Sequence, residues 1–130
     1  MKDDVREVIE KYVAGVTKPD VDLVRSAFRS DAHMWGYLGD TFVNTPIAGF
    51  LDIVAGTPDP AGWVSGYSYV IPSIEVTGEV AVAVLEETGY LGGNFTNYFS
   101  LVRENGTWAI ASKTFFLTGG AAPPSPSPLP

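Results

Sequence analysis

NFTNYFSLVRENGTWAIASKTFFL, residues 94–117, is the stretch of sequence that decides the fold. It has the pattern of two β-strands joined at Asn105-Gly106, the dipeptide most typical of a tight hairpin turn. Side chains alternate between the two faces of a strand, so Asn97 shares an otherwise apolar face with Phe95 and Phe99. Asn97 is either a core-edge amide bonded to the backbone or a side chain that points into a cavity. The enclosed aromatic face favours the cavity.

The strand pattern continues on the N-terminal side of this hairpin. VAVAVLEETGY, residues 80–90, joins it through the turn Leu91-Gly92-Gly93 and completes a three-stranded meander. A longer strand is expected over residues 63–76. Within it Pro72 marks a β-bulge or an edge position, because proline cannot donate a hydrogen bond to a sheet ladder.

Three helices are expected before these strands. Residues 5–16 carry apolar side chains at i, i+3, i+4 and i+7, the spacing of an amphipathic helix. Asp20 is a natural N-cap for a second, short helix. At Thr45-Pro46 a capping side chain precedes a proline at the expected first helical position. The third helix should then begin at Pro46, with Gly56 as its C-cap, and its apolar stripe is Ile47, Phe50, Leu51 and Val54.

A small hairpin lies between the second and third helices, in residues 32–37 and 41–44. The sequence therefore predicts an α+β domain, with three N-terminal helices on the concave face of a strongly curved, mainly antiparallel sheet. Such a sheet wraps its helices and leaves a tapering interior that suits a small ligand. Residues 1–118 are expected to form this single domain, and residues 119–130 a Pro/Ser-rich tail that is disordered or extended.

Composition excludes several classes of function. The 130-residue chain has no cysteine and a net charge of −7, which excludes thiol chemistry and disfavours nucleic acid as a partner. No apolar run approaches the ~20 residues of a membrane span, and the charged start argues against a signal peptide, so a cytoplasmic location is expected. There is no metal-ligand spacing, phosphate loop or dinucleotide fingerprint, and we expect neither a metal nor a cofactor.

Four stretches within residues 5–117 follow the pattern of a known superfamily. They are VIEKYVAGV, DVDLVRSAFRSDAHMWGYLG, PIAGFLDIVAG and the strands from YSYVIPSIEV to ASKTFF. In these stretches the chain resembles the NTF2-like superfamily of ketosteroid isomerases and SnoaL-type cyclases, and within it most resembles the putative lumazine-binding subfamily. The resemblance implies an NTF2-like cone. It implies no single activity, because this fold hosts isomerases, dehydratases, cyclases, hydrolases and binding proteins.

The resemblance to ketosteroid isomerases implies roles for three positions. Tyr12 falls where those enzymes carry an oxyanion-binding tyrosine, and Asn97 where they carry a protonated acid that binds the same oxygen. Gly36 falls where their proton-transferring aspartate lies. Tyr12 and Asn97 can still donate hydrogen bonds to a carbonyl or enolate oxygen. Without a carboxylate at position 36, steroid-type isomerisation is not expected.

The remaining polar candidates are His33 and the adjacent pair Glu86 and Glu87. His33 lies on the strand face opposite Gly36, which favours a surface or interface residue over a proton carrier. Glu86 and Glu87 point to opposite faces, and the inward one is either solvated at the strand end, which we favour, or a buried base with a raised pKa. The candidate catalytic set is Tyr12, Asn97, Glu87 and His33.

Aromatic side chains could line a pocket for a planar ligand, or could equally form the core or a dimer face. The candidates for ligand binding are Trp35, Phe50, Trp63, Tyr67, Phe95, Phe99 and Phe116.

Two functions of different classes are open. The first is a cofactor-independent enzyme of isomerase, cyclase or dehydratase type, whose hydrophobic pocket acts on a small aromatic or polyketide-like molecule. The second is a non-catalytic module that binds a small molecule or forms a dimer. Polar atoms on an aromatic face favour the first, and the missing hairpin carboxylate favours the second. Because strands such as VAVAVL are apolar on both faces, we expect a homodimer through the outer face of the sheet.

Overall fold

A computed structural model describes residues 1–57 and 60–123 of the chain. Within these residues three α-helices and six β-strands follow one another, with two short 3₁₀ turns, Pro60–Gly62 and Val64–Gly66, before the third strand. The elements are α1 (Lys2–Thr17), α2 (Val21–Ala27), β1 (Phe28–Leu38), β2 (Thr41–Pro46), α3 (Ile47–Ala55), β3 (Ser68–Thr77), β4 (Val80–Tyr90), β5 (Gly93–Glu104) and β6 (Thr107–Gly120).

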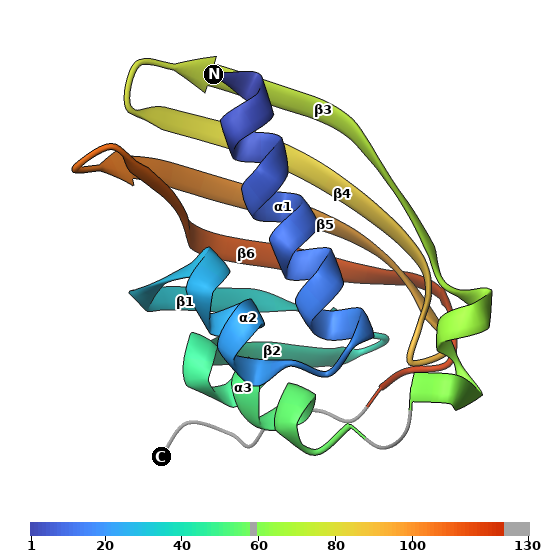
Figure 1. Cartoon of the computed structure of the whole chain (residues 1–130). Coiled ribbons are helices and arrows are strands. Elements are labelled where there is room, and N and C mark those ends of the chain that lie inside the picture. Colours follow the sequence, from blue (N-terminus) through green and yellow to red (C-terminus); the bar gives the residue numbers. More distant parts are fainter. Residues whose placement is uncertain (58–59, 124–130) are drawn as a thin grey trace.

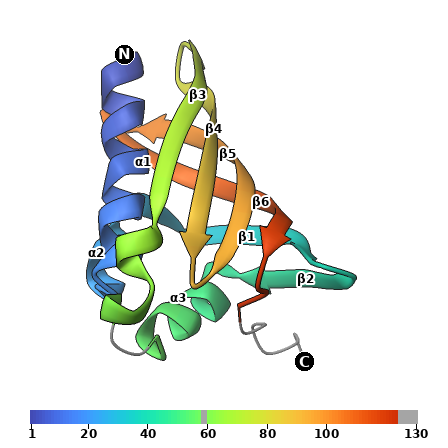
Figure 2. The same cartoon turned by 90° about the vertical axis from the view of Figure 1, so that its right-hand side faces the viewer.

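The six strands form one curved sheet in the order β2-β1-β6-β5-β4-β3. All neighbours are antiparallel except β1 and β6, which run parallel. The β4–β6 meander occupies the centre of the sheet. Figures 1 and 2 show the helices gathered on its concave side, with α1 against β3, β4 and β6, and α3 against β1 and β2. The predicted α+β architecture is confirmed.

Local signals explain several boundaries. The Asp20 side chain accepts a hydrogen bond from the Leu23 N–H at 3.1 Å, which confirms it as the N-cap of α2. Asn105 and Gly106 have φ values of 53° and 78°, the left-handed conformation that a tight hairpin turn requires at both central residues. The predicted turn between β5 and β6 is thereby confirmed.

The start of α3 differs from its prediction by one residue. Pro46 was expected at the first helical position but is the last residue of β2, with an extended backbone at φ −58° and ψ 160°. Thr45 does not cap the helix, because it stays in the sheet opposite Met34. The pairing of β1 with β2 therefore extends through Pro46, and the helix begins at Ile47.

The strand expected over residues 63–76 begins later, at Ser68, because residues 60–66 form the two 3₁₀ turns. Pro72 combines both predicted features. It lies in β3, an edge strand of the sheet, where the register against β4 shifts between Val70 and Ser73. An edge position with a bulge leaves the missing proline N–H without consequence.

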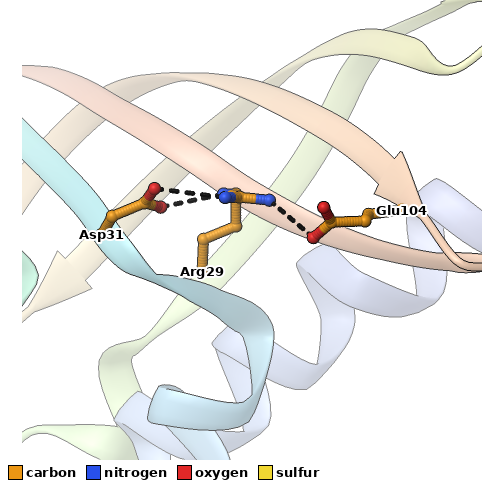
Figure 3. Close-up of polar contacts among 3 residues, drawn as sticks. All are labelled: Arg29, Asp31 and Glu104. Atoms are coloured by element: carbon orange, nitrogen blue, oxygen red, sulfur yellow. Dashed lines mark hydrogen bonds and ion pairs between the residues drawn. The ribbon is translucent and has the colours of Figure 1, made fainter.

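An exposed ion-pair cluster connects the start of β1 with the end of β5 (Figure 3). The Arg29 guanidinium donates to both carboxylate oxygens of Asp31, at 2.8 and 3.1 Å, and to Glu104 at 3.1 Å. Both carboxylates are solvent-exposed. Such pairs contribute little, about 0–1 kcal/mol each, so apolar burial between helices and sheet holds the fold together.

The C-terminal end of the chain continues the sheet beyond the expected domain boundary, because β6 extends to Gly120. Most of the expected tail, residues 124–130, lies outside the described residues. Among the described helices, none combines the length and apolarity that a membrane crossing requires.

Gly36→Ala tests the closest approach between β1 and β6. A Cβ at position 36 would meet the Phe115 carbonyl oxygen and lie 2.6 Å from the Phe115 ring. The backbone of β6 cannot move away without disturbing its pairing with β1. We expect the variant to lose about 1–3 kcal/mol of unfolding free energy in urea melts. Gly62→Ala is the control, because its Cβ would meet nothing within 4 Å. Equal stability of the two variants would contradict this packing.

Candidate active site

Three neighbouring strands each direct one polar side chain into the space between sheet and helices. Glu87 lies on β4, Asn97 on β5 and Lys113 on β6, and they are only 3%, 1% and 4% exposed. The strand register explains their proximity, since Asn97 pairs with Leu85 on one side and with Phe115 on the other. Side chains two residues apart on a strand share a face, so Glu87 and Lys113 both flank Asn97.

Glu87 is the centre of a buried hydrogen-bond network. Its Oε2 accepts from the Tyr67 hydroxyl at 2.7 Å, and its Oε1 accepts from Asn97 Nδ2 at 2.8 Å. Asn97 Nδ2 also donates to the Leu85 carbonyl at 3.2 Å. The favoured interpretation of Glu87 as a solvated strand-end residue is wrong, because Glu87 is buried and the Tyr67 and Asn97 side chains cover its carboxylate.

These contacts also answer the question that Asn97 raised. The amide is bonded to the backbone of β4, as a structural residue would be, and it lines a cavity as well. Its main charged partner is the Glu87 carboxyl group. Asn97 therefore orients the carboxylate inside an apolar interior, where an unpaired carboxylate would be costly.

Burial raises the pKa of Glu87 above its ordinary value. The positive charge of Lys113 and the hydrogen bonds from Tyr67 and Asn97 act in the opposite direction. A carboxyl group in this position takes up and releases a proton nearer to neutral pH than a solvated glutamate does.

Lys113 is a candidate site residue that the sequence analysis missed. Its Nζ donates a hydrogen bond to the Tyr12 hydroxyl at 2.9 Å and lies 4.0 Å from the centre of the Phe50 ring. Burial lowers the pKa of Lys113 to about 8, although the nearby Glu87 charge favours the protonated form. No ion pair joins Lys113 to Glu87 or to any other described residue.

A β-bulge explains why the sequence pattern hid this lysine. Trp108 and Ile110 are buried, and continued alternation would place Ser112 and Phe116 inward. The register between β5 and β6 shifts there, since Ser100 pairs with Ser112 and Leu101 with Ile110. The extra residue reverses the alternation, so Lys113 and Phe115 point inward instead.

Tyr12 lies behind Lys113, away from the cavity wall. It is fully buried, and its ring packs on Phe28, Phe50 and Phe99. Burial raises the pKa of Tyr12 well above its ordinary value. The phenol therefore stays neutral and holds the Lys113 amine in place.

A small cavity lies between Glu87, Asn97 and Lys113. Its volume is about 30 Å³, and its apolar wall includes Phe50, Phe95 and Phe115. This space holds one or two water molecules. A larger ligand fits only when side chains of the wall move.

The structure gathers some of the predicted site residues and separates others. Phe50 and Phe95 line the cavity. Phe99 packs on Tyr12, and Tyr67 binds Glu87. The half-buried Trp63 packs on Tyr67 and Tyr90. His33, Trp35 and Phe116 lie on the opposite, convex face of the sheet. His33 bonds to Asn44, and Trp35 and Phe116 are 38% and 55% exposed. Strand alternation in β1 and the bulge in β6 place them there.

Gly36 lies on the inner face, as the resemblance implies, and no other residue type fits there. The Phe115 backbone and ring occupy the space that a Cβ would need. Glu87, on the far side of Asn97, is the inward carboxylate that the described residues do provide. These residues contain no group of three His, Asp or Glu side chains that could hold a metal ion.

Solved structures share this fold. An NTF2-like protein of unknown function from Methylobacillus flagellatus has a TM-score of 0.80 at 28% identity, over 90% of this chain and 91% of its own. A second, from Shewanella baltica, has a TM-score of 0.74 at 27% identity, over 86% and 89%. A ketosteroid isomerase-like protein from Erwinia carotovora atroseptica has a TM-score of 0.66 over 91% and 96%, and at 13% identity it shows the fold alone.

The fold and the inward polar residues therefore define a protein of the NTF2-like class, as the sequence predicts. More narrowly, the chain belongs to the family described as "Putative lumazine-binding", whose family model matches residues 1–116. A comparison with curated proteins finds no match.

Lys113→Met tests the cost of burying this amine. Unfolded lysine has a pKa of 10.5 and the folded group about 8, so below about pH 8 the folded state carries a penalty of about 3 kcal/mol. Between these values the unfolded state holds a proton that the folded state lacks, and wild-type stability rises with pH. We expect the variant to unfold at higher urea than the wild type near pH 7, even after loss of the Tyr12 hydrogen bond, worth about 1 kcal/mol.

The difference should shrink as the pH rises from about 8 to about 10.5. Lys18→Met is the matched control, because Lys18 is exposed at the end of α1 and should show no such trend. A stability difference that stays constant across this pH range would contradict the buried cation.

Proposed function

We propose that the chain is a cofactor-independent enzyme that moves a proton on a small aromatic or polyketide-like molecule, in a reaction of isomerase, cyclase or dehydratase type. One observation carries this proposal. Buried Glu87 and buried Lys113 line the same cavity, and neither forms an ion pair with any residue that the structure describes. Groups whose environments shift their pKa values toward neutrality are typical of proton-transfer sites.

The proposal gives each group a role. The Glu87 carboxylate takes a proton from a carbon beside a carbonyl group, and Asn97 and Tyr67 hold it in position. The Lys113 ammonium group donates to the oxygen on which negative charge develops. Protonated Glu87 then returns the proton to another atom of the same molecule. Hydrogen bonds and charges are in place before reaction, so little reorganisation is needed.

Two further observations support a small aromatic ligand. The cavity wall is aromatic around its three polar side chains. The description of the family, lumazine binding, names a planar heteroaromatic compound. A ring of that size exceeds the cavity of about 30 Å³, so binding includes displacement of wall side chains such as Phe50 or Phe95.

Glu87→Gln tests the proton carrier. Glutamine keeps the volume and can accept from Asn97 through its oxygen, while its amide donates to the Tyr67 hydroxyl, so the fold should persist. We expect the wild type to accelerate deuterium uptake beside the carbonyl of 2-tetralone in deuterated water, followed by NMR. The variant should lose this acceleration by a factor on the order of 10²–10⁴.

Glu86→Gln is the matched control for this experiment. Glu86 is the adjacent residue, but it is exposed on the opposite face of β4, so its variant should match the wild type. Equal rates for both variants would remove Glu87 from the mechanism. Absence of any acceleration by the wild type would remove this activity toward aromatic ketones and favour the non-catalytic module.

The non-catalytic alternative has its own support on the convex face, where we infer a homodimer interface. Tyr37 lies between Phe42 and Phe116, with ring centres 5.3 and 6.3 Å apart, and these rings are 44–55% exposed. An exposed aromatic group of this kind is typical of a protein interface. A dimer through this face is compatible with either function, because the cavity lies on the other side of the sheet.

Phe116→Asp tests the interface. A carboxylate placed among these rings would be desolvated in a dimer, so light scattering should give a dimer for the wild type at tens of micromolar and a monomer for the variant. Ser26→Asp, an exposed change on α2, should leave the mass unchanged. A monomeric wild type at that concentration would contradict the inferred dimer.

A further inference from the structure

Lys113 has the surroundings of a nucleophilic amine. Its Nζ faces three aromatic rings, at 4.0 Å from the centre of Phe50 and 5.2 Å from those of Tyr12 and Phe115. Its one hydrogen-bond partner among the described residues is the Tyr12 hydroxyl. The titratable groups packed around it are Tyr12 from α1 and Glu87 and Tyr90 from β4. Among residues 1–57 and 60–123, no carboxylate forms an ion pair with Lys113, so no salt bridge holds its proton.

We propose that Lys113 forms a covalent imine with aldehydes or ketones that enter the cavity, so that carbonyl compounds are the ligand class of this site. The inference rests on the proposed function only in taking the same cavity as the binding site. It does not require proton transfer on carbon.

The neutral amine is well populated under ordinary conditions. With its pKa lowered to about 8, about a quarter of Lys113 is neutral near pH 7.5, against about one in a thousand for an unperturbed lysine. The chain has three other lysines, Lys2, Lys11 and Lys18, all on α1 or at its end. None of them is buried, so Lys113 is the amine that folding activates.

Glu87 supplies the acid that imine formation needs. The Lys113 lone pair attacks the carbonyl carbon, and one amine proton passes to the carbonyl oxygen, giving a carbinolamine. Protonated Glu87 then donates to the new hydroxyl group, which leaves as water while the nitrogen lone pair forms the C=N bond. The products are a protonated imine, one water molecule and the Glu87 carboxylate, and no oxidant or reductant is consumed. The positive imine and negative Glu87 then face each other across the cavity.

Reductive trapping tests the inference. The folded protein is treated with propanal, which is small enough to enter with little rearrangement, and cyanoborohydride, which reduces imines to stable amines. Peptide mass mapping should find more propyl label at Lys113 than at Lys2, Lys11 and Lys18 together, and this preference should vanish in urea. Between about pH 6 and pH 9 the labelling rate at Lys113 should level off above about pH 8.

Two variants complete the test. The triple variant K2R/K11R/K18R should still take up one propyl group at Lys113. Lys113→Arg and Lys113→Met should lose that label, and the α-amino group is distinguished by its own peptide. A Lys113 peptide that stays unlabelled in the folded wild type, while surface lysines react, overturns the proposal.

The labelling experiment tests the imine, and the deuterium-uptake experiment tests proton transfer on carbon, so each proposal can fail without the other. Deuterium uptake that depends on Glu87, without label at Lys113, would keep the proposed function and overturn the imine. Label at Lys113 without any deuterium uptake would keep the imine and overturn proton transfer on carbon. In Glu87→Gln the label should form more slowly but at the same residue, because the nucleophile is intact and only the acid is lost.

Discussion

The burial of a carboxylate and an amine in one apolar interior is the constraint on which the rest of this structure depends. Each group loses most of its hydration, and each would be expensive without partners. The fold supplies separate, uncharged partners to each group: Tyr67 and Asn97 bind Glu87, and Tyr12 binds Lys113. A direct ion pair would have relieved both groups at once. Its absence leaves both of them facing the cavity.

The sheet makes this arrangement possible through its irregularities. The bulge in β6 turns Lys113 and Phe115 inward. A second bulge lies at Pro72 in the edge strand β3, and Tyr67, the residue just before β3, donates its hydroxyl hydrogen bond to Glu87. Bulges of this kind increase local twist and re-aim side chains. α1 then lies across the concave face and brings Tyr12 against the amine from the opposite side (Figure 1). Residues 101 positions apart in sequence thus form one hydrogen bond.

The sequence predicted those features that depend on local chemistry. Asp20 as a cap and Asn105-Gly106 as a turn act through neighbouring backbone groups, and both were confirmed. Features that depend on pairing between distant strands were predicted less well. Local sequence predicts Pro46 as helical because it does not contain the pairing of Pro46 with His33 in β1. It predicts Glu87 as solvated because the hydroxyl of Tyr67, 20 residues away, is what covers the carboxylate. Lys113 was missed because strict alternation from Ile110 points it outward, and only the register against β5 reveals the extra residue.

Gly36 and Glu87 together show how the interior differs from the pattern that ketosteroid isomerases suggest. At position 36 the inner face of β1 has no room for a side chain beside Phe115. The buried carboxylate comes from β4 instead and lines the cavity together with an amine from β6. Burial raises the pKa of the carboxyl group and lowers that of the amine. Both shifts favour the neutral pair of acid and amine over the charged pair, relative to the same groups in water. A ligand that offers a carbonyl oxygen favours the charged amine, whereas one that offers a carbonyl carbon favours the neutral one, so the bound molecule itself selects which form of the site is populated.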